Sequence, residues 1–197
     1  MLERYGFSGL LKLFISLVYT KLFYSKARLL RMPIDIRNRR NIRIGKKMTT
    51  GTGCRLEAYP QSNREGILMS FGDDVEINDY VHITAMERVS IGNNVLIASK
   101  VYISDCTHGS YGGDINDSSP LLAPSARQIH TKPVIISDNV WIGEFVSILP
   151  GVTIGKGAII GTMSVVTKSI PEYSIAVGSP AKVIKTYNFN TKQWERI

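Results

Sequence analysis

A six-residue repeat runs through the middle of this chain and restricts its fold more than any other feature. Aliphatic or aromatic residues recur six apart in two stretches, with one two-residue slip: Phe71, Ile77, Ile83, Ile91, Ile97 and Ile103, then Ile136, Ile142, Ile148, Ile154, Ile160 and Val166. A small or β-branched residue usually follows four places later, and glycine often follows immediately, as at Gly92 and Gly143. This spacing fits neither the helical period of about 3.6 residues nor the strand period of about 2.

A fixed six-residue period is typical of a parallel β-helix, in which each hexapeptide forms one flat face of a three-sided prism. The aliphatic residues would point to the axis, and coils would stack about 4.8 Å apart so that equivalent positions form ladders. Twelve repeats predict four coils. Glycine or asparagine is expected where the chain turns, often through positive φ. A sandwich of short strands would instead show turn signals about every 8–12 residues.

Length and composition indicate one soluble domain. A chain of 197 residues with 44% hydrophobic content can bury a core of its own. Cys54 and Cys106 form neither a disulfide framework nor a Cys-x-x-Cys pair, and no cleavable secretory signal is evident. We therefore expect a reduced, cytoplasmic setting.

Positive charge is concentrated near the start of the chain. Residues 1–47 hold 12 Lys and Arg against Glu3 and Asp35, a net charge of +10, and the remaining residues have a net charge of −2. A basic segment of this kind can bind nucleic acid, but no recognised nucleic-acid-binding fold accompanies it. We therefore expect no nucleic-acid partner.

Residues 10–24 form an apolar stretch that is interrupted by Lys12 and Lys21, and Pro33 stops any helix. The stretch is shorter than the roughly 20 residues that a membrane span requires, so we expect that it does not cross a bilayer. One interpretation is an amphipathic helix lying on an anionic membrane surface. The alternative is a helix that packs its apolar side on the prism or on a neighbouring subunit.

One long interruption breaks the repeat. Ile103 and Ile136 lie 33 residues apart where the repeat requires 6, so 27 extra residues leave the prism. Long excursions from a compact scaffold are usually functional. His108 lies near the start of this one, where a rigid face meets a flexible cover. A histidine can act as a general base near neutral pH, although a single histidine can equally be structural.

These motifs together resemble those of the hexapeptide-repeat O-acetyltransferases, over roughly residues 67–186. The resemblance rests on the repeat, on the histidine-bearing loop and on three further runs: Ile91-Gly92-Asn93-Asn94-Val95, Val140-Trp141-Ile142-Gly143 and Gly178-Ser179-Pro180-Ala181. More narrowly, the whole chain is similar to a lipopolysaccharide O-antigen O-acetyltransferase. The resemblance implies a homotrimer of left-handed β-helices, acetyl-CoA as the donor, a sugar hydroxyl as the acceptor, and active sites between neighbouring prisms.

The same resemblance assigns roles to individual residues. His108 would take the proton from the acceptor hydroxyl as it attacks the thioester carbonyl, a direct transfer that needs neither a serine nucleophile nor a metal. Asn78 matches a position that contacts the acceptor sugar in galactoside-type relatives, and its alternative role is that of a turn residue. The positions that match the family's CoA site are Glu144, Thr162, Thr167, Lys168, Lys182 and Lys185.

Three of these positions depart from the galactoside-type pattern. Glu144 stands where a small residue contacts CoA, and Lys182 and Lys185 stand where arginine is common. A lysine can neutralise a phosphate but cannot form the bidentate contact of an arginine. Gly109 follows the histidine where those relatives have proline, which predicts a different acceptor pocket.

The sequence therefore predicts three segments: a basic amphipathic helical segment at 1–40, a left-handed β-helix acyltransferase domain at 41–186 with the loop 104–135, and a tail at 187–197. The expected partners are acetyl-CoA, a sugar or lipid-linked glycan, other copies of the chain and, through residues 1–31, the inner face of the membrane.

Two other classes remain as alternatives. One is a non-catalytic trimeric scaffold, which would need neither the histidine loop nor Thr167-Lys168. The other is a zinc β-helix of the carbonic-anhydrase type that uses His82, His108 and His130, although their separations of 26 and 22 residues do not match that family.

Overall fold

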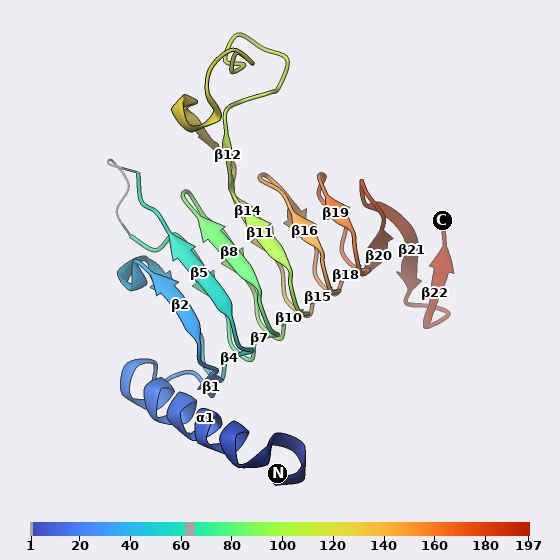
Figure 1. The fold of residues 1–197 in the computed structure, drawn as a ribbon. Helices are drawn as coiled ribbons and strands as arrows, with labels where there is room; N and C mark the ends of the chain where they lie inside the picture. Colours follow the sequence, from blue (N-terminus) through green and yellow to red (C-terminus); the bar gives the residue numbers. More distant parts are fainter. Residues whose placement is uncertain (1, 62–65) are drawn as a thin grey trace.

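The computed structural model describes residues 2–61 and 66–197, and in it the chain winds into a three-sided parallel β-helix (Figure 1). Successive strands of one turn belong to three different sheets, and each strand pairs in parallel with its equivalents in the turns below and above. We name the three sides of the prism face A, face B and face C. The predicted β-helix is therefore confirmed.

The strands of each face follow one another in coil order. Face A contains β1 (Leu29–Leu30), β4 (Thr49–Thr50), β7 (Glu76–Ile77), β10 (Leu96–Ile97), β15 (Trp141–Ile142), β18 (Ile159–Ile160) and β20 (Ser174–Val177), extended by β21 (Lys182–Asn188) and β22 (Gln193–Arg196). Face B contains β2 (Ile34–Arg37), β5 (Cys54–Ala58), β8 (His82–Ala85), β11 (Tyr102–Ser104), β16 (Ser147–Ile148) and β19 (Val165–Val166). Face C contains β3 (Ile42–Arg43), β6 (Met69–Phe71), β9 (Val89–Ile91), β14 (Val134–Ile136) and β17 (Thr153–Ile154).

The repeat residues form the core of the prism. All twelve aliphatic or aromatic positions of the repeat are buried, and they stack in register, as Ile83, Ile103 and Ile148 do on face B. The small residues four places later are buried too, except Thr107, which is exposed because the chain has left the prism there. Aliphatic ladders of this kind bury apolar surface continuously along the axis, which is the main source of stability.

The prism is longer than the clean repeat predicts. The strands β1, β2 and β3 form a coil N-terminal to the repeat, and β4 and β5 begin a second one. The first strand starts at Leu29, so the prism begins well before the expected boundary at residue 41. At the other end, β20, β21 and β22 pair in antiparallel fashion and continue face A past residue 186. The early coils escape sequence detection because their hexapeptides contain polar inward residues such as Thr50, which is buried.

At Gly92 and Gly143, glycine has a different cause from the positive φ expected at the turns. Positive φ falls two places after the glycine position, at residues such as Asn94 and Phe145, with φ of 53° and 56°. A Cβ added at Gly92 would lie 2.4 Å from an Asp138 oxygen, and one at Gly143 would lie 2.7 Å from the Thr162 nitrogen. Glycine is required there because the next coil passes too close for a side chain, not because of backbone twist.

The excursion leaves face B after Ser104 and returns to face C at Val134. Its base is an antiparallel hairpin of β12 (Cys106–His108) and β13 (Ile129–Thr131), which projects away from the prism in Figure 1. The loop beyond the hairpin contains a short 3₁₀ helix, Pro124–Ala126, and another precedes β3 at Arg39–Asn41. The expected excursion at 104–135 is therefore a structured arm.

The N-terminal helix α1 (Leu2–Phe23) lies across the first coil (Figure 1). Gly6, with φ of 61°, interrupts it near its start. The helix docks through polar groups: the Leu30 N–H donates to Thr20 Oγ1 at 2.8 Å, and the Met32 N–H donates to Ser16 Oγ at 2.9 Å. Both hydroxyl side chains are buried.

Several apolar residues of α1 face away from its own prism. Exposed apolar side chains recur at helical spacing on the side opposite the docked hydroxyls, and we call them the apolar stripe: Phe7, Leu11, Phe14, Val18 and Leu22. The expectation that the helix packs its apolar side on its own prism is therefore wrong. By length and composition Gly6–Phe23 could cross a membrane, with 11% of it buried. That the segment does not cross a bilayer stays a prediction.

Candidate functional site

His108 ends β12, at the point where the hairpin opens into its loop. Its side chain is exposed, and among the described residues no hydrogen bond to its imidazole is recorded. Its backbone is held instead: Tyr111 Oη donates to the His108 carbonyl at 2.6 Å, and Arg127 Nη1 donates to Tyr111 Oη at 2.6 Å. The arrangement fixes the backbone and leaves the ring nitrogens open to a substrate.

A buried carboxylate anchors the base of this hairpin. Asp105 has no exposed surface and accepts three backbone hydrogen bonds, from the N–H groups of Met86, Glu87 and Arg88, at 2.8, 2.8 and 2.7 Å. Burial raises the pKa of the Asp105 carboxyl, and the three N–H donors oppose that rise. The Lys132 N–H donates to the Asp105 carbonyl at 2.9 Å, which ties the returning strand to the same point.

A cleft of about 660 Å³ lies between the hairpin and the later coils. Its lining includes Thr107, Tyr111, His130, Lys132 and Thr167. Thr107 and His130 face each other across the hairpin, whereas His108 pairs with Ile129. Neighbouring residues of a strand point to opposite sides, so the His108 side chain lies on the hairpin face that is turned away from Thr107. Thr167 lines the cleft, and His108 is not among its lining residues.

The other predicted residues divide between the edges of the prism. Asn78, Glu144 and Thr162 follow β7, β15 and β18, which puts all three on the edge between faces A and B, where they are exposed. Thr167 and Lys168 follow β19 and lie on the edge between faces B and C, the edge from which the histidine hairpin departs.

Lys182 and Lys185 lie together on face A, and a bulge is the reason. In β21, Lys182 pairs with Val177 and Lys185 pairs with Ile175, with a register shift between the two pairs. Residues three apart in a regular strand would point to opposite sides. The extra residue at the bulge puts the Lys182 and Lys185 side chains on the same side. Since Ile175 and Val177 flank the buried Ala176, both lysines point outward.

The structure therefore separates what the resemblance puts into one site. His108 projects from the edge between faces B and C, and Asn78 sits on the edge between faces A and B. Within one chain, the width of face B lies between these two edges.

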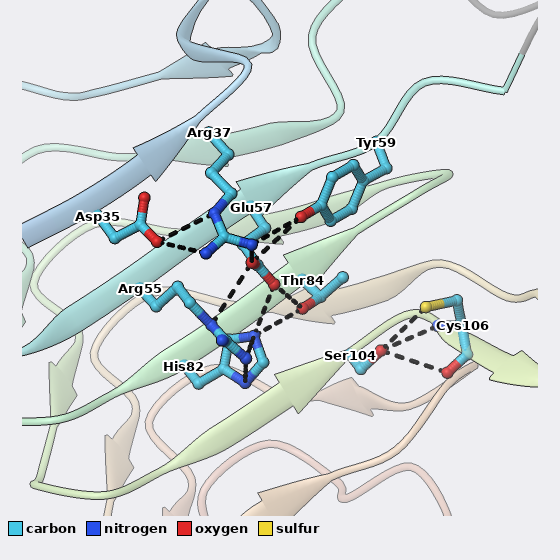
Figure 2. A network of polar contacts seen from close by, with 9 residues as sticks. All are labelled: Asp35, Arg37, Arg55, Glu57, Tyr59, His82, Thr84, Ser104 and Cys106. Atoms are coloured by element: carbon cyan, nitrogen blue, oxygen red, sulfur yellow. Dashed lines mark hydrogen bonds and ion pairs between the residues drawn. The ribbon is translucent and has the colours of Figure 1, made fainter.

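A polar network on the outer side of face B has no counterpart in the sequence-based prediction (Figure 2). Glu57 is only 5% exposed. Its Oε1 forms an ion pair with Arg37 Nη1 at 2.6 Å, and its Oε2 lies 2.9 Å from His82 Nε2. Arg55 Nε lies 3.5 Å from Glu57 Oε1, and Thr84 Oγ1 donates to Oε2 at 3.3 Å. Burial alone raises the pKa of Glu57, but the contacts with His82 and Arg55 outweigh it and hold that pKa below its ordinary value.

The three histidines do not share a location. His82 belongs to the Glu57 network on β8, and His108 and His130 lie on opposite strands of the hairpin. Among residues 2–61 and 66–197, no group of three His, Cys, Asp or Glu side chains could hold a metal ion. The zinc alternative thus lacks a ligand set within one described chain.

A prism of stacked hexapeptides that carries one histidine-bearing arm is the architecture of the hexapeptide-repeat transferases. The family described as bacterial transferase hexapeptide (six repeats) matches residues 133–168. A protein of Escherichia coli strain K12, WbbJ, which is assigned as a lipopolysaccharide biosynthesis O-acetyl transferase, is 44% identical over 194 residues, 98% of this chain and 96% of that protein. This chain belongs to the hexapeptide-repeat O-acetyltransferase family.

One further relative and one solved structure are also similar to this chain. The galactoside O-acetyltransferase of Escherichia coli strain K12 is 35% identical over 134 residues, which cover 65% of this chain and 62% of that enzyme. The crystal structure of AntD, an N-acyltransferase from Bacillus cereus in complex with dTDP and 3-hydroxybutyryl-CoA, matches with a TM-score of 0.67 and 24% identity, over 83% of this chain and 81% of that one. At this identity the match shows the fold alone.

Proposed function

We propose that this protein transfers an acetyl group from acetyl-CoA to a sugar hydroxyl of a lipopolysaccharide O-antigen or a related surface glycan. The observation that carries the proposal is the relationship to WbbJ over 98% of the chain, together with an exposed histidine on a fixed arm. A non-catalytic scaffold would not need an anchored arm that leaves an imidazole open.

His108 acts as the general base. The imidazole removes the proton from the acceptor hydroxyl while that oxygen attacks the thioester carbonyl, and it returns the proton to the sulfur of the leaving CoA. Acetyl-CoA, when bound, supplies the activated acyl group. Lys168, Lys182 and Lys185 fit its phosphates, because two of them share the outward side of face A and the third lies near the same end of the prism.

Each active site is built from two chains of a homotrimer. The support is the separation of His108 from Asn78, Glu144 and Thr162, which lie on the opposite edge of face B in one chain. The site is complete when the histidine arm of one chain meets the edge between faces A and B of a neighbouring prism. Such sharing makes assembly a condition for activity.

The protein works in the cytoplasm, at the inner face of the membrane. The apolar stripe of α1 points away from the prism, and Lys12, Lys21 and Lys26 lie on or directly after the helix. Apolar side chains flanked by basic residues suit an anionic bilayer surface, where each cation contributes about 1 kcal/mol. A lipid-linked glycan acceptor would be present at the same surface.

The proposal is tested by replacing His108 with alanine and measuring thiol release from acetyl-CoA in the presence of the purified glycan. We expect turnover to fall about 10²–10⁴-fold while acetyl-CoA binding persists. His82→Gln, a change to a histidine of the prism outside the arm, is the matched control and should retain turnover. Near-normal turnover of His108→Ala would remove that residue from the mechanism.

Mixed trimers test the shared site. His108→Ala and Asn78→Ala subunits that assemble together should regain activity that neither has alone, because some interfaces then combine an intact histidine with an intact asparagine. If co-assembled trimers stay inactive, the two residues act from one chain.

A further inference from the structure

A groove separates α1 from the first coil of the prism. It has a volume of about 400 Å³, near the lower end of the range for ligand pockets, and it lies far along the chain from the histidine arm. Gly9, Leu13, Ile15, Met32 and Pro33 provide its apolar walls. None of these residues belongs to the acetyl-transfer site.

The polar groups of the groove are already satisfied by the protein. Ser16 Oγ donates to the Lys12 carbonyl at 2.7 Å and accepts from the Met32 N–H at 2.9 Å, and Thr52 Oγ1 donates to the Met32 carbonyl at 3.1 Å. Since these hydroxyls have partners, the surface left for an occupant is mainly hydrocarbon. A hydrocarbon chain could enter without leaving a buried polar group unpaired.

The charges at the groove have one sign. Lys12 and Arg31 line it, and no carboxylate does. The Arg31 guanidinium lies 3.8 Å from Asp79, measured from Nη1 to Oδ1, and the Arg31 side chain keeps 37% of its surface exposed. At that distance the pair is weak, so the guanidinium can still bind an incoming anion.

We propose that this groove binds one hydrocarbon chain of an anionic phospholipid, whose phosphate is held by Lys12 and Arg31. Charge complementarity selects the head group and the apolar walls select the chain. The apolar stripe lies on the same helix, so a helix resting on a bilayer would bring the groove to the lipid. The site rests on the proposed membrane contact for its setting, but its chemistry is independent of acetyl transfer.

The test is isothermal titration calorimetry of the full-length protein with lauroyl-lysophosphatidylglycerol below its micelle concentration. We expect saturable binding at least tenfold tighter than that of lauroyl-lysophosphatidylcholine, which has the same chain and no net charge. Glycerophosphoglycerol, the head group without a chain, should not bind. Each methylene removed from the chain should weaken binding by roughly fourfold, corresponding to about 0.8 kcal/mol.

Matched variants locate the site. Ile15→Glu and Lys12→Glu, which alter the groove, should each weaken binding at least tenfold. Leu17→Glu and Lys26→Glu change the same residue types outside its lining and should stay within twofold. Ile15 and Leu17 are 51% and 43% exposed, so neither substitution disturbs packing.

Three outcomes would overturn the inference. Equal binding of the two lysolipids would mean that no head group is selected. Equal loss in Leu17→Glu and Ile15→Glu would mean adsorption on the helix surface. Absence of saturable binding would mean that the groove does not hold a lipid chain. The assay contains no acetyl-CoA, so an inactive enzyme that still binds the lysolipid would count against the proposed function alone.

Discussion

Replacement of Asp105 by asparagine should loosen the histidine arm without emptying the donor site. The carboxylate is fully buried and accepts three backbone N–H groups from residues 86–88, at 2.7–2.8 Å. Asparagine keeps one acceptor oxygen and turns an NH₂ group toward donors, so at least one buried N–H loses its partner. An unsatisfied buried group costs about 1–3 kcal/mol, and hydrogen bonds to a charged acceptor are stronger than neutral ones, so we expect a loss of roughly 2–4 kcal/mol in the free energy of unfolding.

The functional effect follows from the position of Asp105, three residues before His108. A misplacement of about 1 Å can reduce turnover by about 10²-fold, so kcat should fall by about tenfold to 10²-fold while KM for acetyl-CoA changes little. Urea unfolding measures the first effect, and steady-state kinetics well below the unfolding transition measures the second.

Asp138, which follows β14 on the edge between faces C and A, offers a control. Its Oδ1 accepts one backbone N–H, from Asn93 at 2.6 Å, and no arm departs from that corner. Asp138→Asn should lower stability less and leave kcat unchanged. If Asp105→Asn loses stability but keeps the wild-type kcat, Asp105 does not position His108, and if its stability is unchanged, the three hydrogen bonds do not have the strength assumed.

Three further predictions concern charge and apolar exposure. Reversal of Lys168, Lys182 or Lys185 to glutamate should raise KM for acetyl-CoA roughly tenfold with a smaller effect on kcat, and comparison with the dephosphorylated donor identifies which lysine meets the terminal phosphate. Because the folded-state pKa of Glu57 is lowered, its stabilisation is present above the unfolded pKa of about 4.3 and is lost as pH falls through the folded value. Denaturant unfolding of Glu57→Gln between pH 7 and pH 3 should accordingly show lower stability at pH 7 and a flatter decline, and a curve parallel to wild type would contradict this. Phe14→Glu should release the protein from anionic vesicles in a sedimentation assay at moderate salt, since Phe14 is 63% exposed on the apolar stripe.

The fold was predictable because its signal is local. A six-residue period fixes which side chains point inward, and burial at every repeat position from Phe71 to Val166 follows from it. The position of the arm was predictable for the same reason, because the arm interrupts the six-residue repeat. The reason for the corner glycines was not, because the approach of the next coil, at Gly143 for example, depends on stacking rather than on the turn itself.

The contacts that the sequence did not reveal join residues from different coils. Glu57 and Thr84 are 27 residues apart, and they meet only because β5 and β8 pair in register. In the sequence Asp105 is only one polar residue of a loop, because its hydrogen bonds to residues 86–88 depend on how the coils stack. Docking of α1 on the prism was one of the two interpretations, but its polar mode was missed. The helix docks through Ser16 and Thr20, whereas a pattern-based argument looks for apolar contacts.

The arm is inserted between two strands that are fixed independently of it. Ile103 is held by Ile83 and Ile148, and Ile136 is held by Ile91 and Ile154, so both ends of the insertion are set by ladders that do not involve its residues. Loop-closure entropy grows slowly, by about 0.6 kcal/mol for each doubling of length. The prism can therefore accept arms of other lengths and sequences at small thermodynamic cost. If the arm shapes the acceptor pocket as proposed, we expect that grafting the arm of a relative between Ser104 and Val134 changes the sugar that is acetylated.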